Sequence, residues 1–373
     1  EVVRKYLQET ELETALVASD PRNGDVKAMV GGKDYAQNQY NRVFATTRQP
    51  GSSFKPILYL TALMNSDFTA VTQFKSEPTV FTYDSGKTYA PSNFGNRYPH
   101  DYIDLRRAIK ESDNIYAVNT IMQVGADKVI DTARKLGIEA PMSPVPSLAL
   151  GTYPVSPFAM ASSFAAIANQ GVRVEPVAIL KIEDARGRVL YEAKLKAERV
   201  IEAKYTYVLT KLMESVFEPG GTGYRVAGTL KRPVAGKTGT TDTDAWMVGF
   251  TPELAVAVWV GYDRDRQIGP GESHLALPVF AEFTERTLAP IPPKIFAIPD
   301  GVVNLYIDPE TGKLATENCP DARMEAFVQG TEPIEYCDAH AQPRTSDELP
   351  ALPPAETETD RSWWEDFKRW WNE

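Results

Sequence analysis

The alternation of apolar and polar residues along the chain predicts two kinds of regular element. Two runs that favour strands, at about Thr14 to Ser19 and Asp25 to Gly31, flank a Pro-Arg-Asn-Gly turn and predict a strand pair. Apolar residues at helical spacing predict helices near 53–65, 104–120, 126–137, 156–170 and 277–288. The predicted fold class is therefore α+β, with a helical lobe against an antiparallel sheet and the last helix packed on that sheet.

Three further strands are predicted between residues 233 and 261, with a tight turn at Thr251-Pro252-Glu253 before the last of them. Period-two alternation places the hydroxyls of Thr238 and Thr240 on one face of the first strand. Gly239 between them allows a substrate to approach the backbone closely, and Lys237 adds a positive charge. Taken alone, the string Lys-Thr-Gly has an ordinary interpretation as a structural strand with an exposed lysine.

A loop gives way to a helix at Ser52-Ser53-Phe54-Lys55, because Pro50-Gly51 precede this string and an apolar stretch follows it. Pro56 is tolerated only in the first turn, so the string should lie at the helix N-terminus. Residues three apart share a helical face, so Lys55 can reach the Ser52 hydroxyl, and a desolvated lysine can remove its proton. Alone, Ser-x-x-Lys is common, and most examples are solvated helix starts.

A third polar string, Ser112-Asp113-Asn114, stands between two stretches with helical patterns. Short polar side chains at such a junction can turn outward and bond nearby groups. By itself, a helix cap is the ordinary interpretation of this string.

Composition narrows the class of protein without identifying it. The chain has 373 residues with 43% hydrophobic content, enough for one large or two ordinary domains, and a net charge of -10 that argues against nucleic-acid binding. No run of 18 apolar residues is present. The three histidines, His100, His274 and His340, are far apart and lack flanking motifs, which disfavours a serine-histidine triad and a histidine-based metal site.

The three polar strings occur in one chain, in one order and at domain-scale spacing, and in this the sequence resembles the penicilloyl serine transferases, which include β-lactamases and penicillin-binding proteins. Additional phrases resemble the transpeptidase domain of a bifunctional, class A penicillin-binding protein, over roughly residues 13–290. These phrases are Asp20-Pro21-Arg22-Asn23-Gly24-Asp25, Ala28-Met29-Val30-Gly31-Gly32, Arg48-Gln49-Pro50-Gly51-Ser52, Ala149-Leu150-Gly151-Thr152 and Trp246-Met247-Val248-Gly249-Phe250-Thr251-Pro252.

The resemblance implies the penicillin-binding protein and serine β-lactamase-like fold, with a cleft between the helical lobe and the sheet. It also implies four catalytic residues. Ser52 matches the acylated serine and Lys55 its base. Ser112 would relay the proton to the leaving amine, and Lys237 would set the electrostatics of that relay. No metal and no other cofactor is expected.

Substrate recognition is also carried over from the resemblance. Asn114 would hydrogen-bond the peptide stem, while Thr238, Gly239 and Thr240 would bind the terminal carboxylate of D-Ala-D-Ala. The backbone N–H groups of Ser52 and Thr240 would form the oxyanion hole.

The function expected on this basis is D,D-transpeptidation of peptidoglycan stem peptides, with a D-Ala-D-Ala donor, an amine acceptor and acylation by β-lactam antibiotics. A D,D-carboxypeptidase or a β-lactamase on the same scaffold is the first alternative, and a β-lactam-binding receptor is the second. The chain contains no Glu-x-x-Leu-Asn string of the kind that positions deacylating water in class A β-lactamases. The expected location is the extracytoplasmic face of the bacterial cell membrane.

Four segments are expected along the chain. Residues 1–290 form the transpeptidase domain, 291–338 a C-terminal extension, 339–361 a flexible linker rich in Pro, Glu and Ala, and 362–373 an amphipathic Trp-rich helix. That helix is expected to bind this protein's own surface, a membrane interface or a protein partner. Because the chain starts at Glu1 without a signal segment, a fragment is expected, from which a membrane anchor and a glycosyltransferase domain of the family type are missing.

Two cysteines, Cys319 and Cys337, fall in the extension and have no C-x-x-C partner. In an oxidising compartment they can form a disulfide, which would contribute about 3 kcal/mol by the chain-entropy model. Two separate thiols are the alternative.

Overall fold

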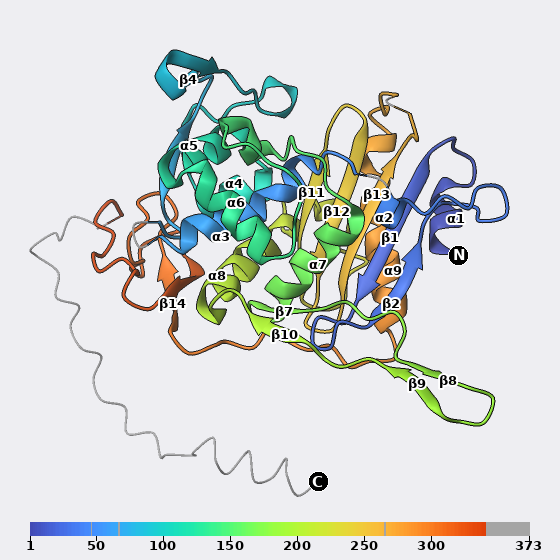
Figure 1. Ribbon diagram of the computed structural model, residues 1–373. Coiled ribbons are helices and arrows are strands. Elements are labelled where there is room, and N and C mark those ends of the chain that lie inside the picture. Colours follow the sequence, from blue (N-terminus) through green and yellow to red (C-terminus); the bar gives the residue numbers. More distant parts are fainter. Residues whose placement is uncertain (46, 66–67, 265, 341–373) are drawn as a thin grey trace, which may run out of the picture. The chain divides into compact units, whose positions relative to one another are not determined.

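A five-stranded antiparallel sheet with the order β11-β12-β13-β1-β2 lies at the centre of the computed structural model (Figure 1). The structure describes residues 1–45, 47–65, 68–264 and 266–340. All five strands lie in the parts of the chain where the sequence predicted strands. Their bounds are β1 Glu13–Ser19, β2 Val26–Val30, β11 Ala235–Thr240, β12 Asp244–Phe250 and β13 Ala255–Gly261.

Both faces of this sheet are covered, which explains why β12 and β13 are buried at every position. Helix α7, Pro157–Ala168, packs on one face, and α9, Ala276–Leu288, packs on the other together with α1, Val2–Leu7 (Figure 1). Alternate residues of β13 belong to two different hydrophobic clusters, as the period of two requires.

The helical lobe is built around α3, Lys55–Leu63, whose residues are all buried. Four other helices complete the lobe: α4 Leu105–Glu111, α5 Asn114–Val124, α6 Ala126–Lys135 and α8 Ala203–Glu214. Helix α3 packs against α5, α6 and α8. The predicted junction at Ser112-Asp113-Asn114 is confirmed, because α4 ends at Glu111 and α5 begins at Asn114 with Asp113 as its N-cap.

Smaller elements surround the lobe and the sheet, and the sequence pattern had not indicated them. They are α2 Arg42–Ala45, β3 Gln73–Ser76, β4 Phe81–Tyr83, β5 Lys87–Tyr89, β6 Asp101–Asp104, β7 Val172–Val174, β8 Lys181–Glu183, β9 Val189–Glu192, β10 Ala197–Arg199, β14 Val302–Ile307 and β15 Arg323–Val328. Of these, the hairpin β8–β9 projects from the rest of the compact unit (Figure 1).

The antiparallel pair β14–β15 packs against the helical lobe through buried charges. The Arg323 guanidinium donates to the carboxylates of Asp104 and Glu325, and Arg106 lies 3.4 Å from Glu325. Burial raises the pKa of Glu325 despite the two guanidinium groups beside it. The strand pair β14–β15 therefore stabilises the start of α4, the helix that ends next to Ser112.

Contacts between Cα atoms divide the chain into two units, Glu1–Cys337 and Asp338–Glu373. The segment 291–337 therefore belongs to the same compact unit as the sheet and the lobe. Of the second unit the structure describes residues 338–340, so the predicted linker beyond residue 340 and the predicted helix 362–373 lie outside the described residues. In the described part of the chain, no helix has the length and apolar character needed to cross a membrane.

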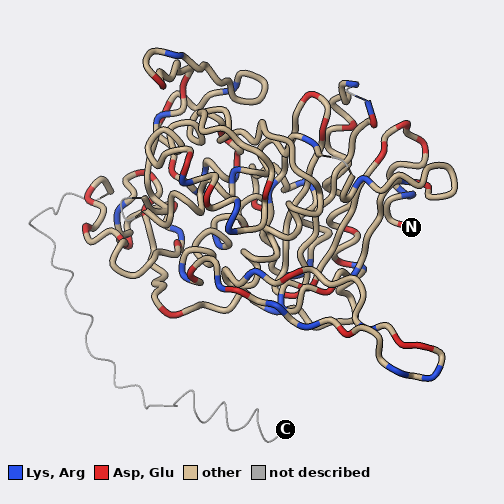
Figure 2. Tube along the Cα trace, viewed as in Figure 1, with Lys and Arg blue, Asp and Glu red and all other residues tan. Residues whose placement is uncertain are grey.

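Basic and acidic residues alternate along much of the described chain (Figure 2). Lys55 and Lys237 differ from most of these charged residues because both of their side chains are fully buried. Buried lysines are rare unless they are paired or functional, so these two direct attention to the region between the lobe and the sheet.

Candidate active site

Ser52 lies in a 3-10 turn, Gly51–Phe54, that leads directly into α3. This placement at the start of the helix confirms the prediction from Pro56, which occupies the first turn. Ser52 is half-buried, whereas Ser53 is fully buried and its hydroxyl donates to the Pro50 carbonyl at 2.7 Å. Of the two adjacent serines, Ser52 is the one whose side chain a substrate can reach.

The Lys55 ammonium, on the first residue of α3, connects the serine turn to the α4–α5 junction. Its Nζ donates to the carbonyl oxygens of Ser112 at 2.8 Å and Asp113 at 3.0 Å, and to Oδ1 of Asn114 at 2.7 Å. Burial lowers the pKa of Lys55 to about 7, although the Asp113 carboxylate favours the charged form. A large fraction of Lys55 is therefore neutral near pH 7, unlike a lysine in water with a pKa of about 10.4.

Lys237, on β11, reaches the same junction from the sheet. Its Nζ donates to the Ser112 hydroxyl at 2.8 Å, and burial together with the nearby charge of Lys55 holds the pKa of Lys237 well below its ordinary value. Ser112 itself has a φ of 64°, a left-handed conformation that is uncommon for a residue other than glycine. The structure thus joins the three strings at Ser112, whose backbone contacts one lysine and whose hydroxyl contacts the other.

The backbone of β11 packs directly against the serine turn. A Cβ on Gly239 would lie 2.2 Å from the Pro50 carbonyl oxygen and 2.9 Å from the Ser53 amide nitrogen, and a Cβ on Gly51 would lie 3.1 Å from the Thr240 carbonyl oxygen. This close approach is possible only because residues 51 and 239 are glycines. Ser52 and the strand that carries Lys237 are therefore neighbours.

Gly239→Ala is expected to separate β11 from the serine turn, because a methyl group cannot occupy a position 2.2 Å from a backbone oxygen. We expect a loss of about 1–3 kcal/mol in the free energy of unfolding and a strongly reduced rate of labelling by fluorescent penicillin. Gly228→Ala is the matched control, because no atom lies within 4 Å of the added Cβ there. Unaltered unfolding and labelling of Gly239→Ala would show that this contact does not hold the site together.

Thr238 has a partner that sequence analysis missed. Its hydroxyl donates to the Thr222 hydroxyl at 2.7 Å, and the Thr222 amide donates to the Lys110 carbonyl at 3.1 Å. Thr222 belongs to the glycine cluster Gly220-Gly221-Thr222-Gly223, which the sequence indicates only as a loop. No local signal separates this threonine from other loop residues, since its role depends on contact with a distant strand.

Asp113 caps α5, as the sequence indicated, but the sequence did not indicate its other hydrogen-bond partners. Its buried carboxylate accepts from the Tyr116 amide at 2.7 Å, from Asn93 Nδ2 at 2.6 Å and from the Ser76 hydroxyl. Asn93 in turn accepts from the Asn114 amide at 2.7 Å. These bonds hold the α4–α5 junction in the conformation that Lys55 contacts.

Asn114 is held at both ends of its side chain. Its Oδ1 accepts from Lys55, and its Nδ2 donates to the Ser92 carbonyl at 2.7 Å. An amide has two N–H donors and an oxygen with two lone pairs, so one donor and one lone pair remain for other partners.

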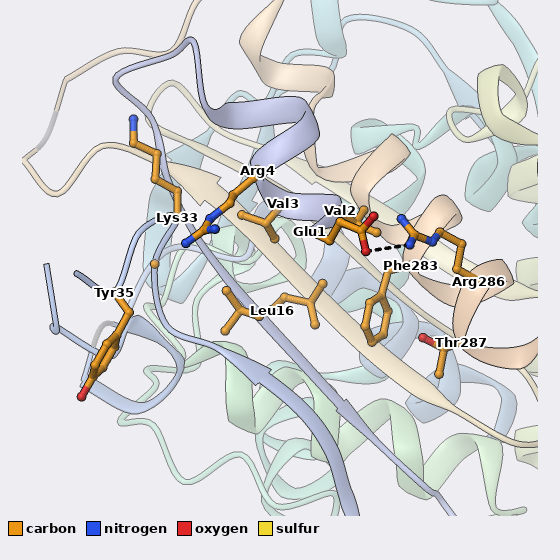
Figure 3. Close-up of a pocket in the computed structure, with 12 residues that line it drawn as sticks. Glu1, Val2, Val3, Arg4, Leu16, Lys33, Tyr35, Phe283, Arg286 and Thr287 are labelled. Atoms are coloured by element: carbon orange, nitrogen blue, oxygen red, sulfur yellow. Dashed lines mark hydrogen bonds and ion pairs between the residues drawn. The ribbon is translucent and has the colours of Figure 1, made fainter. Parts of the chain in front are cut away.

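A cavity of about 500 Å³ lies away from these residues, at the packed ends of α1 and α9 and beside β1 and β2 (Figure 3). Its wall includes Leu16 and Phe283, and the Glu1 carboxylate accepts from Arg286 at 2.9 Å beside it (Figure 3). None of the residues in the three strings lines this cavity. The three strings therefore meet at the junction of the lobe and the sheet, away from this cavity.

Comparison with known proteins agrees with the fold and the motifs. Residues 14–285 match the family model of the penicillin binding protein transpeptidase domain, and residues 298–342 match that of the penicillin-binding protein 1A C-terminal domain. The first match covers most of the chain, and the chain belongs to the penicillin-binding protein transpeptidase family. The family resemblance and the fold class predicted from the sequence are both confirmed.

Individual relatives support the same conclusion. The chain is 40% identical over 365 residues to penicillin-binding protein 2D of Bacillus subtilis, covering 95% of this chain and 52% of that protein. The crystal structure of penicillin-binding protein 1A from Haemophilus influenzae superposes with a TM-score of 0.81 at 29% identity, covering 88% of this chain and 55% of that chain. The PonA1 protein from Mycobacterium tuberculosis in complex with penicillin V gives a TM-score of 0.70 at 26% identity, covering 80% of this chain and 84% of that chain. The chain spans about half the length of the curated relatives it matches.

Proposed function

We propose that this chain is a serine D,D-transpeptidase that cross-links peptidoglycan stem peptides through an acyl-enzyme on Ser52. The observation that carries the proposal is the convergence of two buried lysines on Ser112, beside the turn that presents Ser52. Acyl transfer requires a nucleophile, groups that can hold or release a proton, and polar groups that bind the substrate. Ser52, the two lysines and the edge of β11 are suited to these roles.

Acylation begins with attack of Ser52 Oγ on the carbonyl of the penultimate D-Ala. Neutral Lys55 accepts the hydroxyl proton, and this role is supported by its burial and by a pKa lowered to about 7. The C–N bond to the terminal D-Ala breaks as the tetrahedral intermediate collapses. An ester between Ser52 and the stem peptide remains.

The leaving D-Ala amine needs a proton, which the Ser112 hydroxyl delivers. Lys237 Nζ donates to this hydroxyl at 2.8 Å, and this hydrogen bond stabilises Ser112 while its proton is in transit. The proton that Lys55 took from Ser52 then replaces the one that the Ser112 hydroxyl has given up, and the two residues are adjacent, because Lys55 Nζ donates to the Ser112 carbonyl at 2.8 Å. Ser112 thus relays the proton from Lys55 to the leaving amine.

Binding of the substrate is assigned to the edge of β11 and to the α4–α5 junction. Thr238, Gly239 and Thr240 lie on β11 next to the serine turn, and the hydroxyls of the two threonines, with the charge of Lys237, bind the terminal carboxylate. The remaining amide donor of Asn114 binds the peptide stem. The backbone N–H groups of Ser52 and Thr240 stabilise the oxyanion.

In the second half of the reaction, the amine of an acceptor stem attacks the ester, forms the new peptide bond and releases Ser52. β-Lactams acylate the same serine, which is consistent with the family description and with the penicillin V complex of PonA1. Peptidoglycan lies outside the cytoplasm, so we place the enzyme at the extracytoplasmic face of the membrane. We also propose that the enzyme is attached to the membrane through a segment outside the residues of this chain.

A time course with a D-Ala-D-Ala donor and an added amine tests the function. We expect a lasting adduct with fluorescent penicillin and a product that contains the amine and whose yield rises with amine concentration. Release of D-Ala with only hydrolysed donor would identify a D,D-carboxypeptidase, and rapid loss of the penicillin adduct would identify a β-lactamase. Stoichiometric labelling without turnover of any stem peptide would identify a receptor.

A further inference from the structure

A second group of reactive side chains lies in the C-terminal part of the compact unit. The ligand atoms of Asp308, Cys319 and Cys337 all lie within 4.8 Å of one another, and Cys337 Sγ donates to Asp308 Oδ2 at 3.1 Å. The three side chains are buried, with exposed fractions of 1%, 7% and 3%. The mechanism proposed above uses none of them.

Backbone pairing brings these residues together from three separate segments. Asp308 directly follows β14, and Cys337 lies beyond the end of β15. Leu314 forms bridges to both Ile307 and Tyr336, and the Cys337 amide donates to the Leu314 carbonyl at 2.8 Å. Main-chain pairing therefore holds the segments that carry Asp308 and Cys337 next to each other, which favours a preorganised site.

The surrounding groups orient two of the three side chains. The Thr311 hydroxyl donates to Asp308 Oδ2 at 2.6 Å, and the Thr316 amide donates to Cys319 Sγ at 3.2 Å. Ligating carboxylates are typically held by such hydrogen bonds, and a hydrogen bond to sulfur favours the thiolate form that binds metals.

We propose that Asp308, Cys319 and Cys337 are ligands of a structural zinc ion. Two sulfurs and one carboxylate oxygen suit Zn²⁺, whereas Ca²⁺ and Mg²⁺ require oxygen ligands. Tetrahedral coordination with Zn–S of about 2.3 Å and Zn–O of about 2.0–2.2 Å places two sulfurs about 3.8 Å apart and a sulfur about 3.6 Å from the oxygen. All the ligand atoms lie within 4.8 Å of one another, so small shifts of the side chains reach these separations, and each thiol that binds releases its proton to solvent.

The zinc would fasten a segment on which the active site depends. It would join the residues that flank β14 and β15, the strand pair whose Arg323 and Glu325 contact the start of α4. Helix α4 ends at Glu111, next to Ser112. Loss of the ion should therefore weaken the support of the α4–α5 junction without removing a group from the reaction.

A zinc site and the disulfide predicted from the sequence exclude each other, because an oxidised cysteine pair cannot supply two thiolates. The sequence indicated no metal site, since the ligands are not in a C-x-x-C motif and approach only through the strand pairing. A structural zinc takes four ligands, and these three residues leave one position open. His340 follows Cys337 with the spacing Cys-x-x-His, so it is the first residue to substitute in the search for the fourth ligand.

Zinc content of the full 373-residue chain tests the proposal. The protein is purified under reducing conditions without chelator, equilibrated with zinc sulfate, desalted and measured by mass spectrometry of the metal. We expect about one zinc per chain, a loss of more than tenfold in Cys319→Ser, Cys337→Ser and Asp308→Asn, and full retention in the matched surface control Asp300→Asn. Removing the metal should lower the Tm by more than about 4 °C.

Circular dichroism of each variant at low temperature separates loss of zinc from loss of folding. Zinc that is absent from the reduced chain, or retained in folded cysteine variants, would overturn the proposal. A Cys319–Cys337 disulfide in protein recovered from the extracytoplasmic compartment would also overturn it. Cobalt offers a second readout, because thiolate-bound Co²⁺ gives a charge-transfer absorption that the two cysteine variants should lack.

Discussion

Ser52→Ala is expected to abolish covalent labelling by fluorescent penicillin and all transfer from a D-Ala-D-Ala donor. The physical reason is that the variant has no oxygen from which the acyl-enzyme could form, so the loss should be complete rather than partial. Intact-protein mass spectrometry measures the adduct directly.

Ser53→Ala is the matched control for this prediction, because it removes a neighbouring hydroxyl that already donates to the Pro50 carbonyl inside the core. That variant should lose about 1 kcal/mol of stability and keep its labelling. Persistent labelling of Ser52→Ala, with loss of labelling in Ser53→Ala, would transfer the nucleophile assignment to the other serine.

Lys55→Ala is expected to lower the acylation rate by about 10²–10⁴-fold, the usual contribution of a general base. Lys55→Arg should be as slow, because a guanidinium stays protonated at every working pH and cannot accept the Ser52 proton. Lys128→Ala, an exposed lysine on α6, is the control for removal of a lysine and should acylate at the normal rate. Normal labelling of a folded Lys55→Ala variant would refute its role as the base.

The pH profile of the unsubstituted enzyme should carry the signature of this lysine. The base is active in its neutral form, so the acylation rate should be low at pH 5 and rise with pH through about 7, where the pKa of Lys55 lies. Because Lys55 and Lys237 repel each other, the apparent pKa of the rise belongs to the pair. An acylation rate that is constant from pH 5 to pH 9 would contradict a titrating lysine base.

Local sequence patterns predicted the main elements well where the hydrophobic period was clear. The strand β1 and the helices α3, α6, α7 and α9 begin and end within a few residues of their predicted bounds. The predicted stretch 104–120 is two helices, as the polar string within it indicated. Helix α8 was not predicted from the pattern, and neither were the small hairpins β4–β5 and β8–β9. Short exposed strands such as β8 and β9 bury too little apolar surface to impose a period.

The sequence by itself determined the family, the order of the three motifs and the identity of the residues expected to react, because these are properties of local strings. Only the tertiary structure decided which serine of the pair is accessible, which atoms of Ser112 each lysine contacts, and that Asp113 and Thr222 support the site. It also decided that Asp308 and the two cysteines converge. The physical reason is that burial, hydrogen-bond partners and lowered pKa values arise from packing between segments far apart in the chain, which no local pattern encodes.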